Sequence, residues 1–240
     1  MKVIDDIYLV GGASYNLSTG CNVYLIDCNH ELVLIDIGSE ADVKLIKENI
    51  VEGGFDPRKV STVLFTHSHL DHAGGAAEAK RNFGCKLGSH VDTAKAIERG
   101  IQESQGKLKP AAVEIKLHGG ETLTFGDKTI KILSTPGHTR EGGDVCYMIE
   151  CGGKRILFTG DTAFKCERGL MGGHPVSAWL GPRRKEEIEM YLHSLRDLLR
   201  LAGPEVLLPG HGLLALKRGR EELKRCIEIV SEYLSEFDKH

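Results

Sequence analysis

Short apolar segments alternate along the chain with amphipathic segments of helical period. Residues 5–12, 21–28 and 31–38 are rich in β-branched and aromatic residues and are bounded by turn formers, which predicts three strands. A helix is expected over residues 39–54, with Ser39 as its N-cap and Gly53 near its end. Later strands are expected over 59–65, 85–88, 112–118, 121–126, 129–135, 144–150, 154–160 and 205–210, and later helices over 73–84, 89–100, 182–203 and 218–237.

The order of these elements is strands, helices, strands and helices, so the two halves of the chain share one plan. Sheets and helices each bury one apolar face, and this order predicts an α/β (α+β) fold in which two sheets pack face to face with helices outside. No low-complexity linker interrupts the sequence. We therefore expect residues 1–240 to form a single domain.

Composition argues against several classes of protein for this chain, namely nucleic-acid-binding, membrane-spanning and cysteine-zinc proteins. A net charge of −3 does not indicate a nucleic-acid-binding surface. Apolar runs stay far below the ~20 residues of a membrane helix. The N-terminus lacks a charged region followed by a long apolar stretch, so we expect a cytoplasmic protein without a signal peptide. Seven scattered cysteines without a CxxC pair indicate small buried side chains rather than a cysteine zinc site.

Four apolar strands are each followed by histidine or aspartate. "STVLF" continues into "THSHLDH", "IKILS" into "TPGHT", "RILF" into "TGDT" and "EVLL" into "PGHG". Strands that end at the same edge would gather these side chains in one cleft, which is where open α/β sheets bind ligands. The residues concerned are His67, His69, Asp71, His72, His138, Asp161 and His211.

Imidazole and carboxylate side chains in this number indicate divalent metal. Imidazole suits zinc, iron or copper, and carboxylate favours harder ions. Seven ligands exceed what one tetrahedral ion can use. Two ions about 3.5–4 Å apart could share them, a known arrangement for hydrolysis, with Asp161 as the bridging carboxylate. Of the other six histidines, all but His174 are interpreted as structural or solvated.

The segment Phe164 to Gly181 fits no strand or helix. It contains several glycines, a proline and the only tryptophan, and it begins three residues after Asp161. Long irregular segments in compact domains often form lids or binding loops. We expect His174 and Trp179 to contact substrate; the alternative is that Trp179 packs in the core and His174 faces water.

The motifs "THSHLDHAGG", "TPGHTREGG", "FTGDT" and "LPGHG", together with the early strands "NVYLID" and "LVLIDIG", resemble the metallo-β-lactamase superfamily over nearly the whole chain. The resemblance implies a four-layer αβ/βα sandwich of two mixed sheets with a dinuclear metal site between them. It also implies the ligand sets: His67, His69 and His138 for the first metal, and Asp71, His72 and His211 for the second, with Asp161 between the two. Asp36 would contact ligands rather than metal. Zinc is the expected ion, with iron and manganese as alternatives, because sites without thiolate accept all three.

Within the superfamily the sequence is most similar to glyoxalase II and the small thioester or lactone hydrolases. Flavodiiron proteins have Glu in place of His69 and carry a flavodoxin module, ribonuclease Z carries large extra arms, and true β-lactamases usually have a signal peptide and often Cys in place of Asp161. Glyoxalase II has a basic residue that meets glutathione near the position of Leu170, and here Arg168 and Lys165 are offset from it. Its helical C-terminal domain is reduced to about one helix, so glutathione thioesters are expected to be poor substrates.

These observations predict a metallo-hydrolase that cleaves a small ester, thioester or lactone. Asp71 would orient the attacking water and pass its proton to the leaving group. The main alternative is a mononuclear iron persulfide dioxygenase using His67 and His69, against which the complete second ligand set argues. A nuclease and a scaffold with structural metals are further alternatives, but structural zinc sites are usually rich in sulfur. No membrane partner is expected, and a homo-oligomer stays open.

Overall fold

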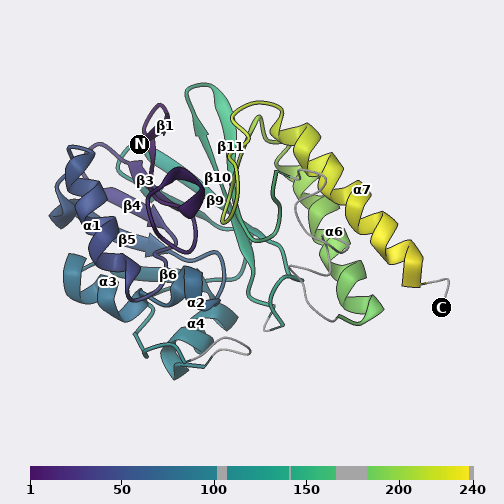
Figure 1. Ribbon diagram of the computed structural model, residues 1–240, viewed down its shortest axis with the longest axis horizontal. Helices are drawn as coiled ribbons and strands as arrows, with labels where there is room; N and C mark the ends of the chain where they lie inside the picture. Colours follow the sequence, from purple (N-terminus) through teal and green to yellow (C-terminus); the bar gives the residue numbers. More distant parts are fainter. Residues whose placement is uncertain (102–106, 141, 166–182, 238–240) are drawn as a thin grey trace.

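The computed structural model describes residues 1–101, 107–140, 142–165 and 183–237 (Figure 1). Its first sheet has seven strands in chain order: β1 (Lys2–Ile4), β2 (Ile7–Gly11), β3 (Val23–Asp27), β4 (Leu32–Ile35), β5 (Val60–Leu64), β6 (Lys86–His90) and β7 (Ile115–Leu117). β1 to β4 pair antiparallel, whereas β4 to β7 pair parallel. The sheet is therefore mixed.

The second sheet has five strands in the order β12 (Val206–Pro209), β11 (Lys154–Gly160), β10 (Val145–Cys151), β9 (Lys128–Ser134) and β8 (Thr122–Phe125). β11 and β12 are parallel, and the other neighbours are antiparallel. Because β10 opposes both β9 and β11, the strands β9, β11 and β12 run in one direction. Their C-terminal ends consequently share one edge of the sheet.

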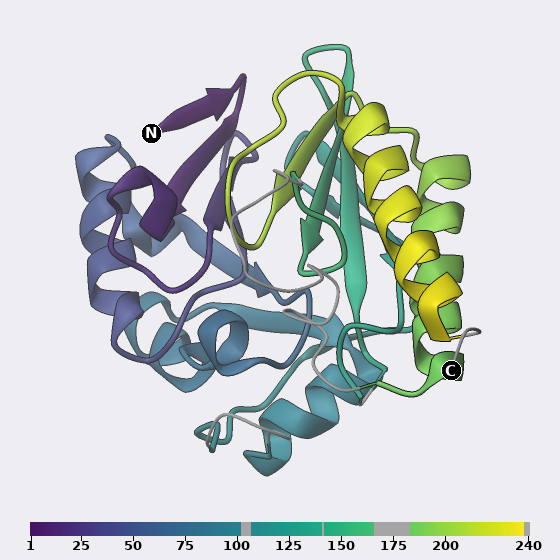
Figure 2. The ribbon, with the colours of Figure 1, turned by 45° about the vertical axis from the view of Figure 1, so that its right-hand side comes forward.

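Helices cover the outer face of each sheet (Figures 1 and 2). The first sheet carries α1 (Asp42–Glu52), α2 (Leu70–Ala73), α3 (Ala76–Phe83) and α4 (Val91–Arg99), and the second carries α6 (Lys185–Leu201) and α7 (Gly219–Phe237). Two short 3-10 helices, η1 (Ala13–Tyr15) and η2 (Pro57–Lys59), lie in connections. The four-layer sandwich of two mixed sheets with flanking helices is thus confirmed.

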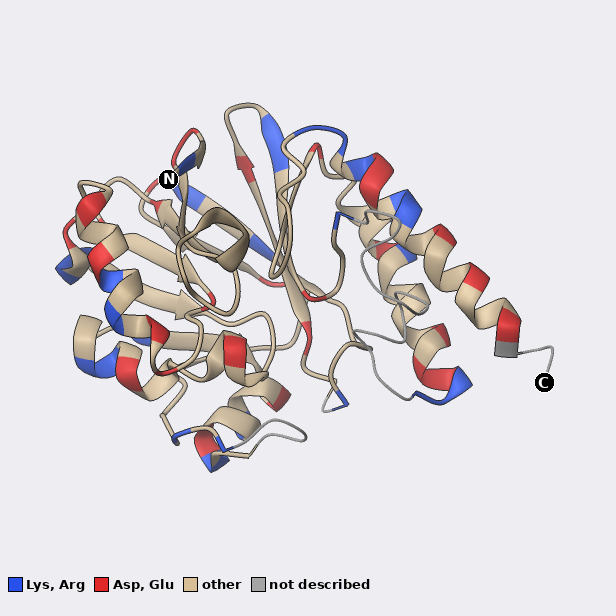
Figure 3. Cartoon of the chain, in the orientation of Figure 1, with Lys and Arg blue, Asp and Glu red and all other residues tan. Residues whose placement is uncertain are grey.

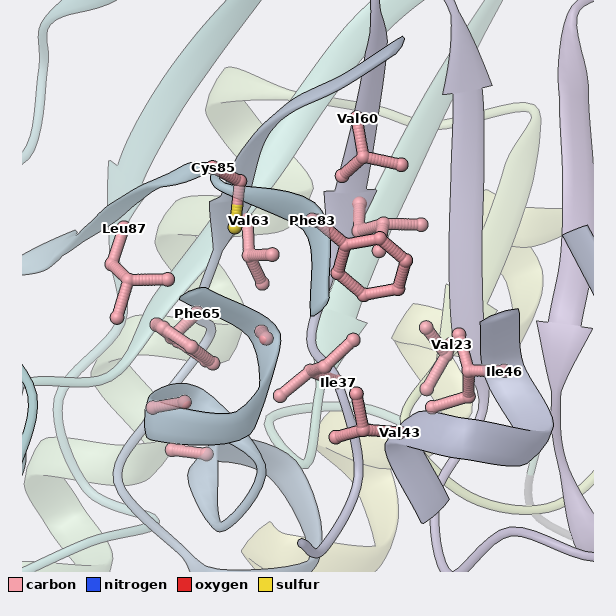
Figure 4. Close-up of a cluster of buried hydrophobic side chains, with 14 of the residues drawn as sticks. Val23, Ile37, Val43, Ile46, Val60, Val63, Phe65, Phe83, Cys85 and Leu87 are labelled. Atoms are coloured by element: carbon pink, nitrogen blue, oxygen red, sulfur yellow. The ribbon is translucent and has the colours of Figure 1, made fainter. Parts of the chain in front are cut away.

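Three apolar cores separate the four layers. In β4, Leu32 and Leu34 pack toward the helices of the first sheet, while Val33 and Ile35 pack toward the second sheet. Figure 4 shows the first of these cores, where Phe83 of α3 lies against strand side chains such as Val63. A third core joins the second sheet to α6 and α7. Strands buried on both faces are apolar at nearly every position, which explains the continuous apolar runs of the sequence.

Three local expectations were wrong. α1 begins at Asp42 with Ala41 at the N-cap, because the Ser39 hydroxyl donates to the Asp42 carboxylate (2.7 Å) instead of accepting a backbone N–H. The helix expected over 73–84 begins only at Ala76, as α3, and the short helix α2, which ends at Ala73 before Gly74 and Gly75, was not expected. β1 was not expected at all, and it pairs with β2 through a turn in which Asp5 has φ 36°.

The surface of the described residues carries both signs of charge. Figure 3 shows Lys and Arg interspersed with Asp and Glu along α1, α3, α6 and α7. Within the described ranges, no helix combines the length and the apolar composition that a membrane crossing requires. The six cysteines at described positions are buried, as the sequence predicts.

Candidate metal centre

The loops that follow β5, β9, β11 and β12 meet where the two sheets open at one edge. They bring together the seven side chains that the sequence singled out. Two groups form, in each of which one ligand atom per residue lies within 4.8 Å of the others. The first group contains His67, His69, His138 and Asp161, and the second contains Asp71, His72 and His211.

Asp161 lies between the two groups. One carboxylate oxygen, Oδ1, is 3.2 Å from Nε2 of His72 in the second group. The other, Oδ2, is 3.4 Å from Nε2 of His138 in the first group and 3.5 Å from Nε2 of His211. The rings of His67 and His72, one from each group, have centroids only 4.1 Å apart. The two groups therefore form one continuous cluster.

The ligand atoms point at one another rather than at protein partners. His69 Nδ1 lies 3.0 Å from His138 Nε2, and His211 Nε2 lies 3.2 Å from His72 Nε2 and 3.0 Å from Asp71 Oδ2. His67 Nε2 is buried without a hydrogen-bond partner among the described residues. Buried polar atoms are normally satisfied, so this arrangement fits a cation held between the converging lone pairs.

Asp36 and Thr66 hold two of the imidazoles from behind. Asp36 follows β4, and its Oδ2 lies 2.9 Å from His72 Nδ1. Thr66 donates its backbone N–H and its hydroxyl to Asp36, both at 2.8 Å, and its Oγ1 lies 3.0 Å from His67 Nδ1. Such contacts place the Nδ1 proton and leave Nε2 as a ligand atom on both rings. Sequence reasoning missed Thr66, although its position directly before His67 was a signal.

Burial and neighbouring charges shift the pKa values of the clustered histidines and of Asp161 in different directions. Burial lowers the pKa of His67 well below its ordinary value and lowers the pKa of His138 to about 3, so both are neutral. Burial also opposes a charge on His72, but the neighbouring acidic groups, Asp161 first and Asp36 among them, together outweigh it and raise the pKa of His72. Burial disfavours ionised Asp161, but His72 outweighs it and holds the pKa of Asp161 well below its ordinary value. The centre thus combines the neutral imidazoles of His67 and His138 with an ionised carboxylate, Asp161, that favours a proton on His72.

One side of the centre is open. His67, His72, His138 and Asp161 are buried and form its floor. Asp71 and His211 keep 33% and 37% of their side-chain surface exposed, and His69 is half-buried. A small molecule can therefore reach the cluster from the side of these three residues. The segment 164–181 with His174 and Trp179, apart from Phe164 and Lys165, lies outside the described residues.

The family model described as "Metallo-beta-lactamase superfamily" matches residues 18–211, which is more than half of the chain and includes all seven side chains. The chain belongs to the metallo-beta-lactamase superfamily. This confirms the resemblance that the motifs indicated.

Named relatives of this superfamily member are hydrolases. It is 31% identical over 150 residues to a hydroxyacylglutathione hydrolase of Brucella ovis, covering 62% of this chain and 47% of that protein, and the Brucella abortus protein matches equally. The chain thus spans about half the length of the curated relatives it matches. A subclass B3 metallo-beta-lactamase of Bradyrhizobium japonicum (24% identity, 100% and 92% of the two chains) has a TM-score of 0.74. The FEZ-1 metallo-beta-lactamase of Legionella gormanii (22% identity, 100% and 95% coverage) has a TM-score of 0.75. These structures share the fold, and the relatives' names support a metallo-hydrolase.

Proposed function

We propose that this protein is a hydrolase that uses two divalent metal ions to cleave a small ester, thioester or lactone. The contact of Asp161 with side chains of both ligand groups is the observation that carries the proposal, because a carboxylate placed between the two groups can serve as a shared ligand for a pair of ions. Zinc is the expected ion, with iron and manganese as alternatives. The net charge of −3 favours a small-molecule substrate over nucleic acid, and we place the protein in the cytoplasm.

In this proposal, each ion has its own ligands. His67, His69 and His138 would hold the first, and Asp71, His72 and His211 the second, with Asp161 shared. Ions bound there would polarise a substrate carbonyl and lower the pKa of water toward neutrality. The buried floor, held by Asp36 and Thr66, would keep the ligands in place and exclude bulk water from beneath the substrate.

Asp71 is the proposed catalytic residue on the protein side. It lies at the open side of the centre, where a substrate and a water molecule can reach it. Burial disfavours its charge, but the hydrogen bond with His211 and the charges of His72 and His211 together outweigh this and lower the pKa of Asp71 to about 2. An ionised carboxylate can accept a hydrogen bond from the attacking water, hold it in line with the carbonyl and transfer its proton to the leaving group.

The proposal is tested by elemental analysis followed by a substrate panel on the same sample. Two ions per chain and turnover of at least one ester, thioester or lactone are expected. A metal-loaded protein that hydrolyses no member of a broad panel, β-lactams included, would contradict the proposal. One iron per chain with oxygen uptake on a persulfide would replace it by the dioxygenase alternative, which the complete group of Asp71, His72 and His211 disfavours.

A further inference from the structure

The loop that carries His211 is held by a side chain from the other sheet. Asn22 directly precedes β3, and the amide Nδ2 donates to the carbonyl of Pro209 (2.9 Å), 187 residues away, and to that of Gly212 (3.2 Å). Its backbone N–H donates to the carbonyl of Gly210 (2.7 Å). One residue, only 2% exposed, therefore binds carbonyls on both sides of His211.

The His211 ring depends on its loop more than the rings of His67 and His72 depend on theirs. His67 and His72 each have a partner at Nδ1, namely Thr66 and Asp36. Every polar contact that the described residues make with the His211 ring involves Nε2, the atom that faces the cluster. The position of the ring therefore follows the backbone of its loop.

The loop also lies directly against the other ligands. A Cβ atom at Gly210 would be 2.5 Å from both Asp161 Oδ1 and His72 Cε1, so the backbone there is in close contact with both groups. Tyr24, on β3, adds a second donor from the first sheet, because its hydroxyl donates to the Pro209 carbonyl at 2.6 Å. A small shift of this loop would move His211 relative to Asp71 and His72.

The Asn22 side chain has one workable orientation. Its Oδ1 faces Gly12, where a Cβ atom would lie only 2.4 Å from it. Its Nδ2 faces two carbonyl oxygens, which require donors. Turning the amide over, or exchanging it for a carboxylate, would place oxygen against oxygen in a buried site and leave both carbonyls without their donor, which is costly.

We propose that Asn22 is a positioning residue that fixes His211 and thereby sets the affinity of the second metal ion, the one assigned to Asp71, His72 and His211. This inference rests on the proposed function, because it assumes that two ions bind. His211 has no partner at its own Nδ1 among the described residues, and Asn22 orients its ring indirectly, by holding the backbone on both sides of His211. Contacts that orient metal ligands typically change metal affinity by about 10–100-fold.

The test is zinc binding to the metal-free protein in competition with a chromophoric chelator, with Asn22→Asp as the main variant. Aspartate has the size of asparagine but no Nδ2 donor. We expect the first zinc to bind as in the wild type and the second to bind about 10–100-fold more weakly. Asn82→Asp is the matched control, because the Asn82 amide also donates to two acceptors, the carbonyl (3.1 Å) and carboxylate (2.6 Å) of Glu78, at the end of α3 away from the ligands. It should change neither affinity.

Tyr24→Phe provides an independent variant if Asn22→Asp does not fold. It removes one donor to Pro209 and keeps the ring, so a smaller weakening of the second zinc alone is expected. Wild-type affinity for both ions in whichever of these variants folds, or equal weakening of both ions, would overturn the inference while the proposed function stands. If the wild type itself binds a single zinc, the dinuclear function and the inference fall together.

Discussion

At the scale of the residue, Asp71 combines exposure with an ionised carboxylate. Asp71→Asn keeps the size of the side chain and little core packing is lost, so without metal its thermal midpoint should stay near that of the metal-free wild type. We expect kcat/KM to fall by at least about 100-fold, because proton transfer by a placed group typically contributes that much, and one metal ion per chain to be lost. Steady-state kinetics and elemental analysis check both effects.

Asp197→Asn is the matched control for this substitution. Asp197 lies on α6, pairs with Arg200 (3.1 Å) and is far from the two ligand groups. It should keep its turnover and its metal. Full activity in Asp71→Asn would exclude the role assigned to that carboxylate.

Single residues also show which parts of the candidate site could be predicted from the sequence. The clustering of the seven side chains could be predicted because four of them fall in one short motif, and each of the others follows an apolar strand. Asn22 could not, because its partners Pro209 and Gly212 lie far along the chain and no local pattern records such a pair. Roles for His174 and Trp179 stay predictions.

At the scale of the element, strands were predictable and junctions were not. β11 and β12 have apolar side chains on both faces, so their ends were clear from the sequence. The division between α2 and α3 depends on tertiary packing. A Cβ atom at Gly75 would lie 2.6 Å from Val43 of α1, so the chain needs glycine where α1 comes close. The alanine-rich pattern around it favours helix throughout and hides this constraint.

The end of β12 offers a test of close approach. Gly210→Ala introduces a methyl group at 2.5 Å from Asp161 Oδ1 and His72 Cε1, and this must displace ligands of both groups. We expect zinc affinity and kcat/KM to fall together by at least about 10-fold, the lower end of the effect of disturbed ligand placement. Chelator competition and steady-state kinetics measure them.

Gly54→Ala separates this effect from a general loss of stability. Gly54 has φ 85° and nothing within 4 Å of an added Cβ, so alanine there costs about 1 kcal/mol of backbone strain without touching a ligand. The thermal midpoint of Gly54→Ala should fall, and its zinc affinity should equal that of the wild type. Unchanged zinc binding in Gly210→Ala would show that the loop after β12 moves to make room for the methyl group, and that its close approach to Asp161 and His72 does not affect metal binding.

At the scale of the whole molecule, the candidate metal centre joins the two sheets. Ligands come from the loop after β5 in the first sheet and from loops after β9, β11 and β12 in the second. Ions that bind only the folded state stabilise it by mass action, by about 2.7 kcal/mol at 100 times the dissociation constant. Removal by a chelator should therefore lower the thermal midpoint by roughly 5–10 °C for each ion removed at this chain length.

Calorimetry with and without a chelator, followed by restoration with zinc, checks this expectation. The matched control is a variant that lacks one ligand candidate of each group, Asp161→Ala with His211→Ala, in which the chelator should change nothing. An equal shift in that variant would mean that the chelator acts elsewhere on the protein.

The final prediction concerns substrate choice. The similar Brucella proteins are named hydroxyacylglutathione hydrolases, but Leu170 stands near the position where the resemblance to glyoxalase II places a basic residue. Glutathione is an anionic tripeptide, and its recognition needs fixed cations because charge-assisted hydrogen bonds are the strong ones. We therefore expect S-lactoylglutathione to be no better a substrate than the lactoyl thioester of an uncharged thiol. Leu170→Lys should lower KM for the glutathione thioester alone. Saturation of the wild type at micromolar S-lactoylglutathione, with the uncharged thioester far poorer, would contradict the prediction and place the cationic partners elsewhere in the chain.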